Sequence, residues 1–163
     1  MTEAYIGLGA NLGDRFHNLH QAVQLLDETP KVQVVRQSLV YETQPVGDVP
    51  QDDYLNQVVV VETELNPQAL LQRLHDIEAA LHRQRIVRWG PRSVDLDLLV
   101  YGDVHMQSPE LTLPHPELAN RRFVLVPLLE VIDKAHATWI AELLMHTLDH
   151  NWVRPYSQEK EEL

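Results

Sequence analysis

Two aspartates able to hold a metal ion lie two residues apart at the start of an apolar segment. Asp95 and Asp97 flank Leu96, and apolar residues continue to Tyr101, which is typical of a β-strand. In a strand, side chains at positions i and i+2 point the same way, about 6.5 to 7 Å apart, so both carboxylates can reach one site. Carboxylate oxygens suit Mg²⁺, which takes one or two of them and shares its other positions between water and substrate phosphates.

Basic residues gather just before these aspartates. Four of the ten arginines of the chain fall within ten residues, with no acidic residue among them: Arg83, Arg85, Arg88 and Arg92. The guanidinium group binds phosphate oxygens in pairs. Spaced aspartates alone, or an arginine-rich loop alone, are also typical of a solvated surface with ordinary ion pairs. Their combination in one segment predicts a polyphosphate substrate with bound Mg²⁺.

Composition excludes several other classes of protein. The chain has 163 residues, of which 24 are acidic and 13 basic, and a net charge of -11 disfavours binding to nucleic acid or to a membrane surface. It has no cysteine, which excludes disulfides and thiol catalysis. The first residues lack the features of a signal peptide, and no apolar run approaches the roughly 18 residues of a membrane span. We expect a cytoplasmic protein with one domain over residues 1–155 and a disordered tail over residues 156–163.

The order of predicted elements indicates the fold class. Patterns of apolar residues predict strands over residues 4–9, 32–41, 54–63 and 96–101, and helices that follow caps at Asp14 and Asn66. This order, β-α-β-β-α-β, predicts an α+β protein with a ferredoxin-like core and an antiparallel sheet. The remainder of the chain predicts C-terminal additions, with a helix near residues 140–148.

The segment 88–99 resembles the signature of the 6-hydroxymethyl-7,8-dihydropterin pyrophosphokinase family. It reads Arg-Trp-Gly-Pro-Arg, two further residues, and then two aspartates alternating with aliphatic residues. Other segments resemble the family in the same order, and the resemblance runs from about residue 2 to about residue 150. These segments are residues 5–13, 41–47, 53–56, 111–116 and 120–123.

The resemblance implies an activity in folate biosynthesis. Members transfer pyrophosphate from ATP to the hydroxymethyl group of 6-hydroxymethyl-7,8-dihydropterin and release AMP. It implies two Mg²⁺ ions held by Asp95 and Asp97, and a catalytic role for Arg83, Arg92 and Asp97. No histidine or glutamate is an obvious general base. The implied partners are ATP and the pterin, and we expect a monomer.

The resemblance also assigns residues that bind ATP. They are Glu78, Arg83, Arg85, Arg88, Arg92, Leu98, Thr112, His115 and Arg121. Considered alone, His115 between two prolines is typical of a turn, and Glu78 is typical of an acid on a helix surface. Both alternatives stay open at this point.

A second set of residues is implied to bind the pterin. They are Gly9, Thr43, Gln44, Val46, Tyr54, Asn56, Trp89 and Phe123. Trp89 and Phe123 match an aromatic pair that encloses the ring, although without the family both are typical of core aromatics. The amide of Asn56 both donates and accepts, as a pterin edge requires. Asparagine is also disfavoured inside a strand, which independently indicates a function.

Three departures from better-known members concern the nucleotide. The arginine segment is about one residue shorter, Pro116 replaces an aromatic residue, and Glu110 stands where a basic residue is common. We therefore expect altered nucleotide affinity with the central chemistry retained. Two other classes of function remain open: a Mg²⁺-dependent nucleotidyltransferase, and a ferredoxin-like domain that binds a ligand without catalysis.

Overall fold

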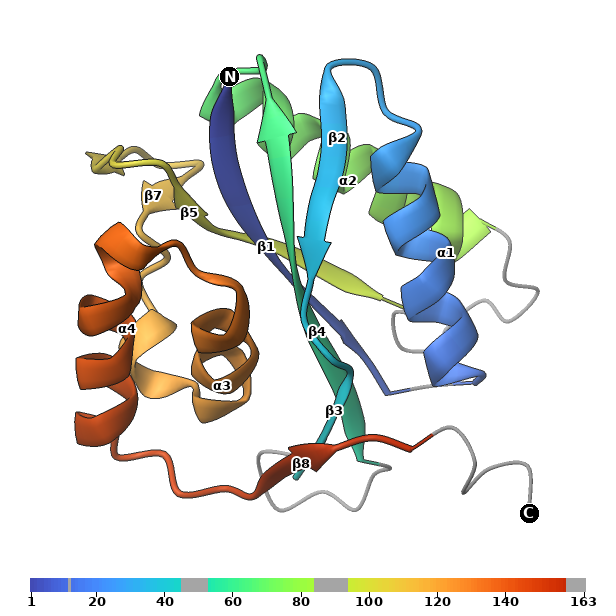
Figure 1. Cartoon of the computed structure of the whole chain (residues 1–163). Coiled ribbons are helices and arrows are strands. Elements are labelled where there is room, and N and C mark those ends of the chain that lie inside the picture. The colour runs from blue at the N-terminus through green and yellow to red at the C-terminus, as the bar shows by residue number, and fades with distance from the viewer. Residues whose placement is uncertain (12, 45–52, 84–93, 158–163) are drawn as a thin grey trace.

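The computed structural model describes residues 1–11, 13–44, 53–83 and 94–157 (Figure 1). Within these ranges an antiparallel sheet of six strands has the order β5-β1-β4-β3-β8, and β2 also pairs with β4. The sheet strands are β1 (Thr2–Ala10), β2 (Val32–Gln37), β3 (Tyr41–Thr43), β4 (Tyr54–Thr63), β5 (Asp95–Tyr101) and β8 (Val153–Pro155). Two short strands, β6 (Met106–Gln107) and β7 (Thr112–Leu113), form a separate hairpin.

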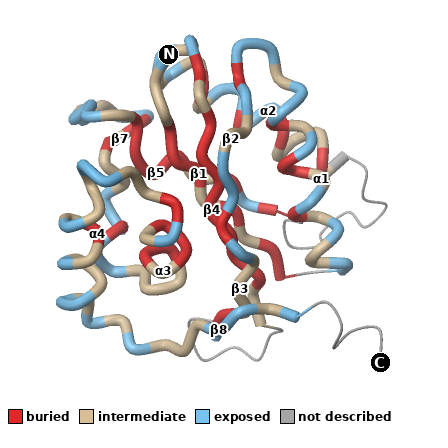
Figure 2. The backbone as a smooth tube through the Cα atoms, viewed as in Figure 1, coloured by how far each residue is buried: buried red, intermediate tan, exposed pale blue. Residues whose placement is uncertain are grey.

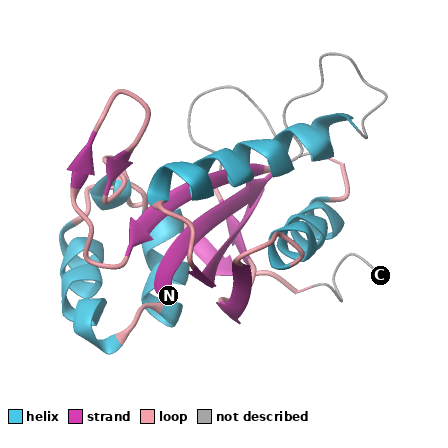
Figure 3. Cartoon of the chain, turned by 90° about the horizontal axis from the view of Figure 1, so that it is seen from above, coloured by secondary structure: helices cyan, strands magenta, loops and turns pink. Residues whose placement is uncertain are grey.

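Helices cover both faces of the sheet, as Figures 1 and 3 show. On one face lie α1 (Arg15–Asp27) and α2 (Pro67–Arg83). On the other face α3 (Arg122–Val131) packs on β4, and α4 (Lys134–His146) packs on α3. The predicted α+β class with an antiparallel sheet is therefore confirmed.

The two helices of the first face begin at the predicted caps. A carboxylate oxygen of Asp14 accepts from the backbone N–H of His17 at 3.1 Å, and the side-chain oxygen of Asn66 accepts from Ala69 N–H at 2.8 Å. Each cap satisfies a backbone donor of the first turn, which stabilises a helix by about 1 kcal/mol. Helix α1 buries its apolar stripe, including Leu19, against the sheet.

Strand β4 is the best-buried strand of the sheet, as Figure 2 shows by the run of red along it. Its residues 58–61 are all valine and all buried. Side chains of a strand alternate between faces, so Val59 and Val61 join the core under α1 and α2. Val58 and Val60 join a second core under α3 and α4. The continuous apolar run is thus explained by helices on both faces.

The strand predicted over residues 32–41 is divided into β2 and β3. Between them the hydroxyl of Ser38 accepts from Val58 N–H at 3.0 Å, and the Ser38 N–H donates to the Val58 carbonyl at 2.9 Å. A side-chain oxygen thus takes a place in the ladder that a backbone carbonyl fills elsewhere. The interruption gives β4 two successive partners along one edge, β2 and then β3.

The C-terminal additions are more extensive than expected. The helix predicted near residues 140–148 begins earlier, where the carboxylate of Asp133 accepts from His136 N–H at 3.0 Å. Helix α3 was not expected, and it contains Pro127. Tyr156, placed at the start of the predicted tail, stacks on Phe16 and donates its N–H to Val40. Residues 158–163 lie outside the described ranges. No helix in the described part of the chain has the length and apolar content that crossing a membrane requires.

Candidate functional site

Two glycines open a space at the C-terminal end of β1. Gly9 lies between Asn56 of β4 and Asp95 of β5, and Gly7 lies between Val58 and Asp97 in the next row of the same face. A Cβ atom added to Gly9 would lie 2.9 Å from the side-chain oxygen of Asn56. Glycine at this position therefore leaves room for the asparagine and for a ligand beside it.

The two aspartates of β5 lie on this face, as their two-residue spacing predicts. Asp95 is exposed, and the side chain of Asp97 is about half exposed. Nη1 of Arg121, just before α3, lies 3.9 Å from Oδ2 of Asp97. This contact is at the limit of an ion pair and leaves both side chains accessible.

A cavity of about 650 Å³ lies over the glycines. Its wall includes six of the residues predicted to bind a pterin, which are Gly9, Thr43, Gln44, Tyr54, Asn56 and Phe123. Asp95, Asp97 and Arg121 also line it. We call it the first pocket.

The amide of Asn56 is oriented by a neighbouring strand. It is buried, and its Nδ2 donates to the hydroxyl of Thr43 at 2.6 Å. The other amide hydrogen and the carbonyl oxygen then face a fixed direction, which explains an asparagine inside a strand. The guanidinium carbon of Arg121 lies 6.0 Å from the ring centroid of Phe123, so the aromatic wall adjoins the charged one.

A second pocket, of about 590 Å³, lies on the other side of the aspartates. Its wall includes five of the residues predicted to bind ATP, which are Glu78, Leu98, Thr112, His115 and Arg121. Glu110 and Pro116, two of the three departures from the family pattern, also line it. Asp95, Asp97 and Arg121 line both pockets, so the two cavities meet at these three side chains.

Glu78 has a defined contact with the sheet. Its Oε2 accepts from the backbone N–H of Leu96 at 3.0 Å, which ties α2 to β5 between the two aspartates. The interpretation of Glu78 as an ordinary helix-surface acid is therefore wrong. In this structure Glu78 supports the strand that presents Asp95 and Asp97.

His115 is held as a neutral ring. Burial lowers its pKa, the nearby Asp97 opposes that shift, and Arg121 adds to it. Its Nδ1 accepts from Glu117 N–H at 3.1 Å, so the neutral ring carries its proton on Nε2. Its backbone N–H donates to the carbonyl of Leu99 at 2.9 Å, which attaches this turn to β5.

Several predicted residues lie outside the described ranges. They are Val46, Arg85, Arg88, Trp89 and Arg92. Arg83 is the last residue of α2, and only its backbone is described. Their predicted roles stay predictions.

The first pocket also has walls that the sequence did not indicate. Leu148, Asp149 and Asn151 line it, although they follow α4 and lie far along the chain from the other lining residues. No local pattern marks these residues, because only the fold brings them there. Gly7 was also missed, and its two-residue spacing from Gly9 was an available signal.

The carboxylates offer a limited set of metal ligands. Among the described residues there is no group of three or more histidine, cysteine or acidic side chains able to hold a metal ion. Two aspartates beside a pocket are instead the number of protein ligands typical of Mg²⁺ bound together with substrate phosphates.

Curated relatives match most of the chain. It is 39% identical over 157 residues to the 2-amino-4-hydroxy-6-hydroxymethyldihydropteridine pyrophosphokinase of Haemophilus influenzae, covering 94% of this chain and 98% of that protein. It is 42% identical over 156 residues to the Bacillus subtilis protein of the same name, covering 96% and 91%. It is 45% identical over 134 residues to the bifunctional protein FolKE of Lactococcus lactis subsp. lactis, covering 82% of this chain but 38% of that longer protein.

Solved structures show the same fold at low sequence identity. One is a crystal structure of Plasmodium falciparum HPPK-DHPS with pterin and p-hydroxybenzoate, with a TM-score of 0.66 and 16% identity over 88% of this chain and 42% of that chain. The family model described as 7,8-dihydro-6-hydroxymethylpterin-pyrophosphokinase (HPPK) matches residues 5–133. Since that match covers well over half of the chain, the chain belongs to the 7,8-dihydro-6-hydroxymethylpterin-pyrophosphokinase family.

Proposed function

We propose that this protein transfers pyrophosphate from ATP to the hydroxymethyl group of 6-hydroxymethyl-7,8-dihydropterin. AMP is the second product, and the reaction belongs to folate biosynthesis. The observation that carries the proposal is the pair of pockets that meet at Asp95, Asp97 and Arg121. A transfer between two substrates needs one site for each of them and a shared boundary where the group passes.

The first pocket suits the pterin. Its volume of about 650 Å³ is in the range of a small-molecule site, and it combines apolar walls with a few oriented polar groups. Phe123 offers a flat face, and the oriented amide of Asn56 offers a donor and an acceptor for the polar edge of the ring. We infer that Gly9 lets this edge approach the strand.

The second pocket suits the nucleotide. The neutral ring of His115 can donate from Nε2, and Arg121 can pair with a phosphate oxygen from the boundary of the two pockets. Glu110 and Pro116 make this pocket differ from the usual family pattern, and we propose that they lower or redirect contacts to the nucleotide.

We propose Mg²⁺ as the cofactor, with two ions held by Asp95 and Asp97 together with the phosphates. The donor set fits, because it consists of two hard carboxylates beside the pocket proposed for the nucleotide. When bound, Mg²⁺ supplies charge neutralisation and orientation of the triphosphate. The hydroxymethyl oxygen gives up its proton to solvent and forms a bond to the β-phosphorus, while the bond from that phosphorus to the oxygen retained by AMP breaks. Arg121 takes up negative charge beside the reacting group, and we assign Arg83 and Arg92 the same task.

The ferredoxin-like core, the monomeric state and the cytoplasmic location also belong to this proposal. The strand order β5-β1-β4 followed by β2 supports a ferredoxin-like core. We keep a monomer in the cytoplasm as our prediction. The chain spans 38% of the length of its bifunctional Lactococcus relatives, so any second activity is a separate question.

The experiment is a chromatographic assay of nucleotides. The protein is incubated with ATP, Mg²⁺ and 6-hydroxymethyl-7,8-dihydropterin, and a matched sample lacks the pterin. We expect AMP and the pterin pyrophosphate in the complete mixture, with little AMP in its absence.

Each of the other possible results would indicate a different activity. ADP as the main product would indicate an ordinary kinase, and free pyrophosphate would indicate a nucleotidyltransferase. A domain that only binds its ligand would leave ATP unchanged. AMP formed equally well without the pterin would also contradict the proposal.

A further inference from the structure

The start of α3 is capped by a residue from the far end of the chain. The residue at its N-cap position, Arg121, makes no side-chain capping hydrogen bond. Instead, Oδ2 of Asp149 accepts from the backbone N–H of Arg122 at 2.8 Å. A carboxylate at this place satisfies a free backbone donor and lies at the positive end of the helix dipole.

Asp149 is itself held on several sides. Its Oδ1 accepts from Asn151 N–H at 3.0 Å, and its own N–H donates to the hydroxyl of Thr147 at 3.3 Å. Nη1 of Arg122 donates to the carbonyl of Asn151 at 3.1 Å, which makes a second link between α3 and this segment. We call the contacts of Asp149 and Asn151 with Arg122 the Asp149 clamp.

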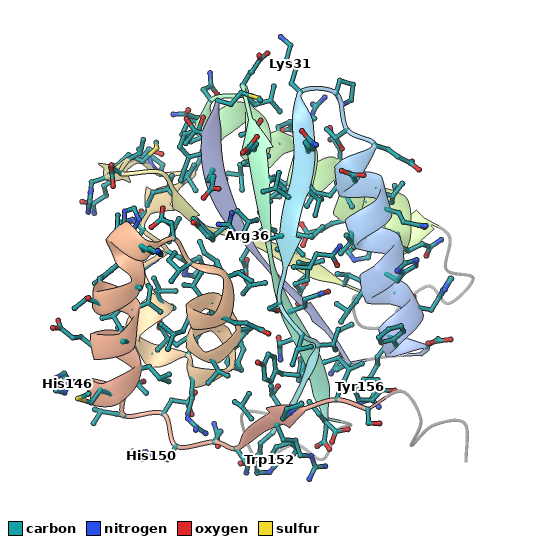
Figure 4. All side chains as sticks on the ribbon, viewed as in Figure 1. Lys31, Arg36, His146, His150, Trp152 and Tyr156 are labelled. Carbon is teal, nitrogen blue, oxygen red and sulfur yellow. The ribbon has the colours of Figure 1, made fainter. Side chains whose placement is uncertain are left out.

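The segment is also tied to the opposite wall of the first pocket. Trp152 N–H donates to the side-chain oxygen of Gln44 at 3.3 Å, and Gln44 N–H donates to the carbonyl of Trp152 at 3.2 Å. Strand β8 then pairs with β3, with Val153 opposite Thr43. Figure 4 shows Trp152 beside β8, at the bottom of the molecule in this view. The segment 147–152 therefore joins two walls of the pocket that are distant in sequence.

The Asp149 clamp holds Arg122, whose two neighbours in the sequence contribute side chains to the proposed site. Arg121 and Phe123 flank Arg122, and both line the first pocket. Arg121 also lies 3.9 Å from Asp97. A shift of the Arg122 backbone would move the aromatic wall and the boundary arginine together.

We propose that Asp149 is a positioning residue for the reaction, which acts by holding the start of α3 so that Phe123 and Arg121 face the first pocket. It lies beyond residues 5–133, the range that the family model matches. The inference rests on the proposed function for the identity of the ligand. It concerns orientation by a hydrogen bond, and not contact of the carboxylate with the pterin.

The test compares Asp149→Ala, Asp149→Asn and the control Glu142→Ala, which removes an exposed acid of α4. Pterin affinity is measured by the fluorescence of 6-hydroxymethylpterin, in the presence of Mg²⁺ and a non-hydrolysable ATP analogue. Loss of one capping hydrogen bond is expected to weaken pterin affinity about tenfold in Asp149→Ala. Asp149→Asn keeps an oxygen that can accept from Arg122 N–H, so its affinity should stay close to that of the wild type, as should that of Glu142→Ala.

A second variant keeps the test decisive if Asp149→Ala does not fold. Arg122→Met keeps the backbone donor and removes only the link to Asn151, so a loss of about threefold is expected, smaller than that of a whole cap. Wild-type affinity in Asp149→Ala or in Arg122→Met would overturn the inference. Asp149→Asn as weak as Asp149→Ala would overturn it too, because charge rather than hydrogen bonding would then matter. If the wild type itself binds no pterin, the proposed function fails and not the clamp, whose hydrogen bond to Arg122 can still be tested by amide exchange.

Discussion

One face of β1 carries two polar regions with opposite character. Towards its start, Glu3 and Tyr5 belong to a network of short contacts, which we call the paired cluster; its members are Glu3, Tyr5, Arg36, Asp133 and His136. Towards its end, Gly7 and Gly9 replace those large side chains and the first pocket opens above them. The alternation of the strand places all four residues on one face.

The paired cluster satisfies its own members. Arg36 donates to the two carboxylate oxygens of Glu3 at 2.9 and 3.1 Å, and to the carbonyl of Val131 at 3.2 and 3.1 Å. Figure 4 shows Arg36 reaching from β2 across the middle of the molecule. Burial raises the pKa of Tyr5 to about 12, so its hydroxyl stays protonated and donates to Glu3. Such a cluster joins the sheet to the end of α3.

At the pocket end, the distance between Arg121 and Asp97 is 3.9 Å. Charges held apart in this way beside a cavity keep much of their capacity to bind a ligand. The difference teaches that the distance between paired groups and the space beside them, rather than the number of polar residues, distinguish the paired cluster from the proposed site. The predictions below change one region at a time.

The largest effect is expected from Asp97→Asn, which keeps the shape of the side chain and removes its charge. Loss of a ligand for the proposed metal should lower the rate of AMP formation by about 100-fold or more. Thermal stability should hardly change, because the Asp97 side chain is about half exposed. Asp76→Ala, which removes an exposed acid of α2 paired with Arg73, is the control and should keep full activity. Near-normal turnover of Asp97→Asn at millimolar Mg²⁺ would contradict the assignment.

A smaller effect is expected from closing the space above β1. In Gly9→Ala the new Cβ would lie 2.9 Å from the Asn56 oxygen, which must move. We expect the KM for the pterin to rise about tenfold, which corresponds to about 1.4 kcal/mol and lies within the usual cost of overpacking. The matched comparison is Gly7→Ala, which also narrows the space but whose Cβ would meet only the side chain of Leu99 at 3.4 Å, so it leaves Asn56 in place and should raise the KM less. Equal KM values for the two variants would show that Asn56 does not need its present position.

A change at the paired cluster should affect stability and spare activity. Arg36→Met keeps the apolar stem and leaves Glu3 and the Val131 carbonyl without their donor, at a cost of about 1–2 kcal/mol. The hydrogen bond from Arg36 lowers the pKa of Glu3 from 4.5, although burial opposes the shift. A lowered pKa in the folded protein stabilises it above pH 4.5, and this contribution is lost as the pH falls towards the folded value.

Urea unfolding of Arg36→Met and wild type at several pH values measures this prediction. The difference in free energy should be full near pH 6 and narrow below pH 4.5. Turnover per folded molecule should be unchanged at pH 7. A difference independent of pH would indicate that packing of the arginine stem, and not its charge, supports the fold.

The parts of the molecule that the sequence predicted are those set by local patterns. The cap at Asp14, the buried valines of β4 and the shared face of Asp95 and Asp97 follow from helix and strand periodicity. The residues of both pockets could be listed in advance only through the family resemblance, because they come from distant elements. The two pockets meet at Asp95, Asp97 and Arg121 because the fold brings β5 and the start of α3 together.

The parts that were missed depend on tertiary contacts. Helix α3 contains a proline, and its cap comes from Asp149, 27 positions beyond Arg122. The break between β2 and β3 depends on the hydroxyl of Ser38 replacing a backbone acceptor. Neither feature leaves a periodic signal in its own segment, so neither was predicted.

The smallest effect concerns His136, at the edge of the paired cluster. Its ring lies between two carboxylates, with Nδ1 2.6 Å from Oδ1 of Asp133 and Nε2 2.7 Å from Oδ1 of Asp103. The hydrogen bond to Asp133 raises the pKa of His136 above 6.5; burial opposes this shift, and Asp103 adds to it. A raised pKa in the folded protein stabilises it fully below pH 6.5, and the contribution is lost as the pH rises through the folded value.

Because Asp103 is largely exposed, solvent weakens the pair, and we expect His136→Asn to cost about 1 kcal/mol, or about 2–4 °C in Tm, at pH 6. The difference from wild type should shrink by pH 8.5, while pyrophosphoryl transfer stays unchanged because the cluster lies outside both pockets. His20→Asn, on the exposed side of α1, provides the control and should leave Tm close to that of the wild type. A Tm difference that is constant from pH 6 to pH 8.5 would mean that the ring acts by packing against Trp139, whose ring centroid is 6.2 Å away, rather than as a cation between two acids.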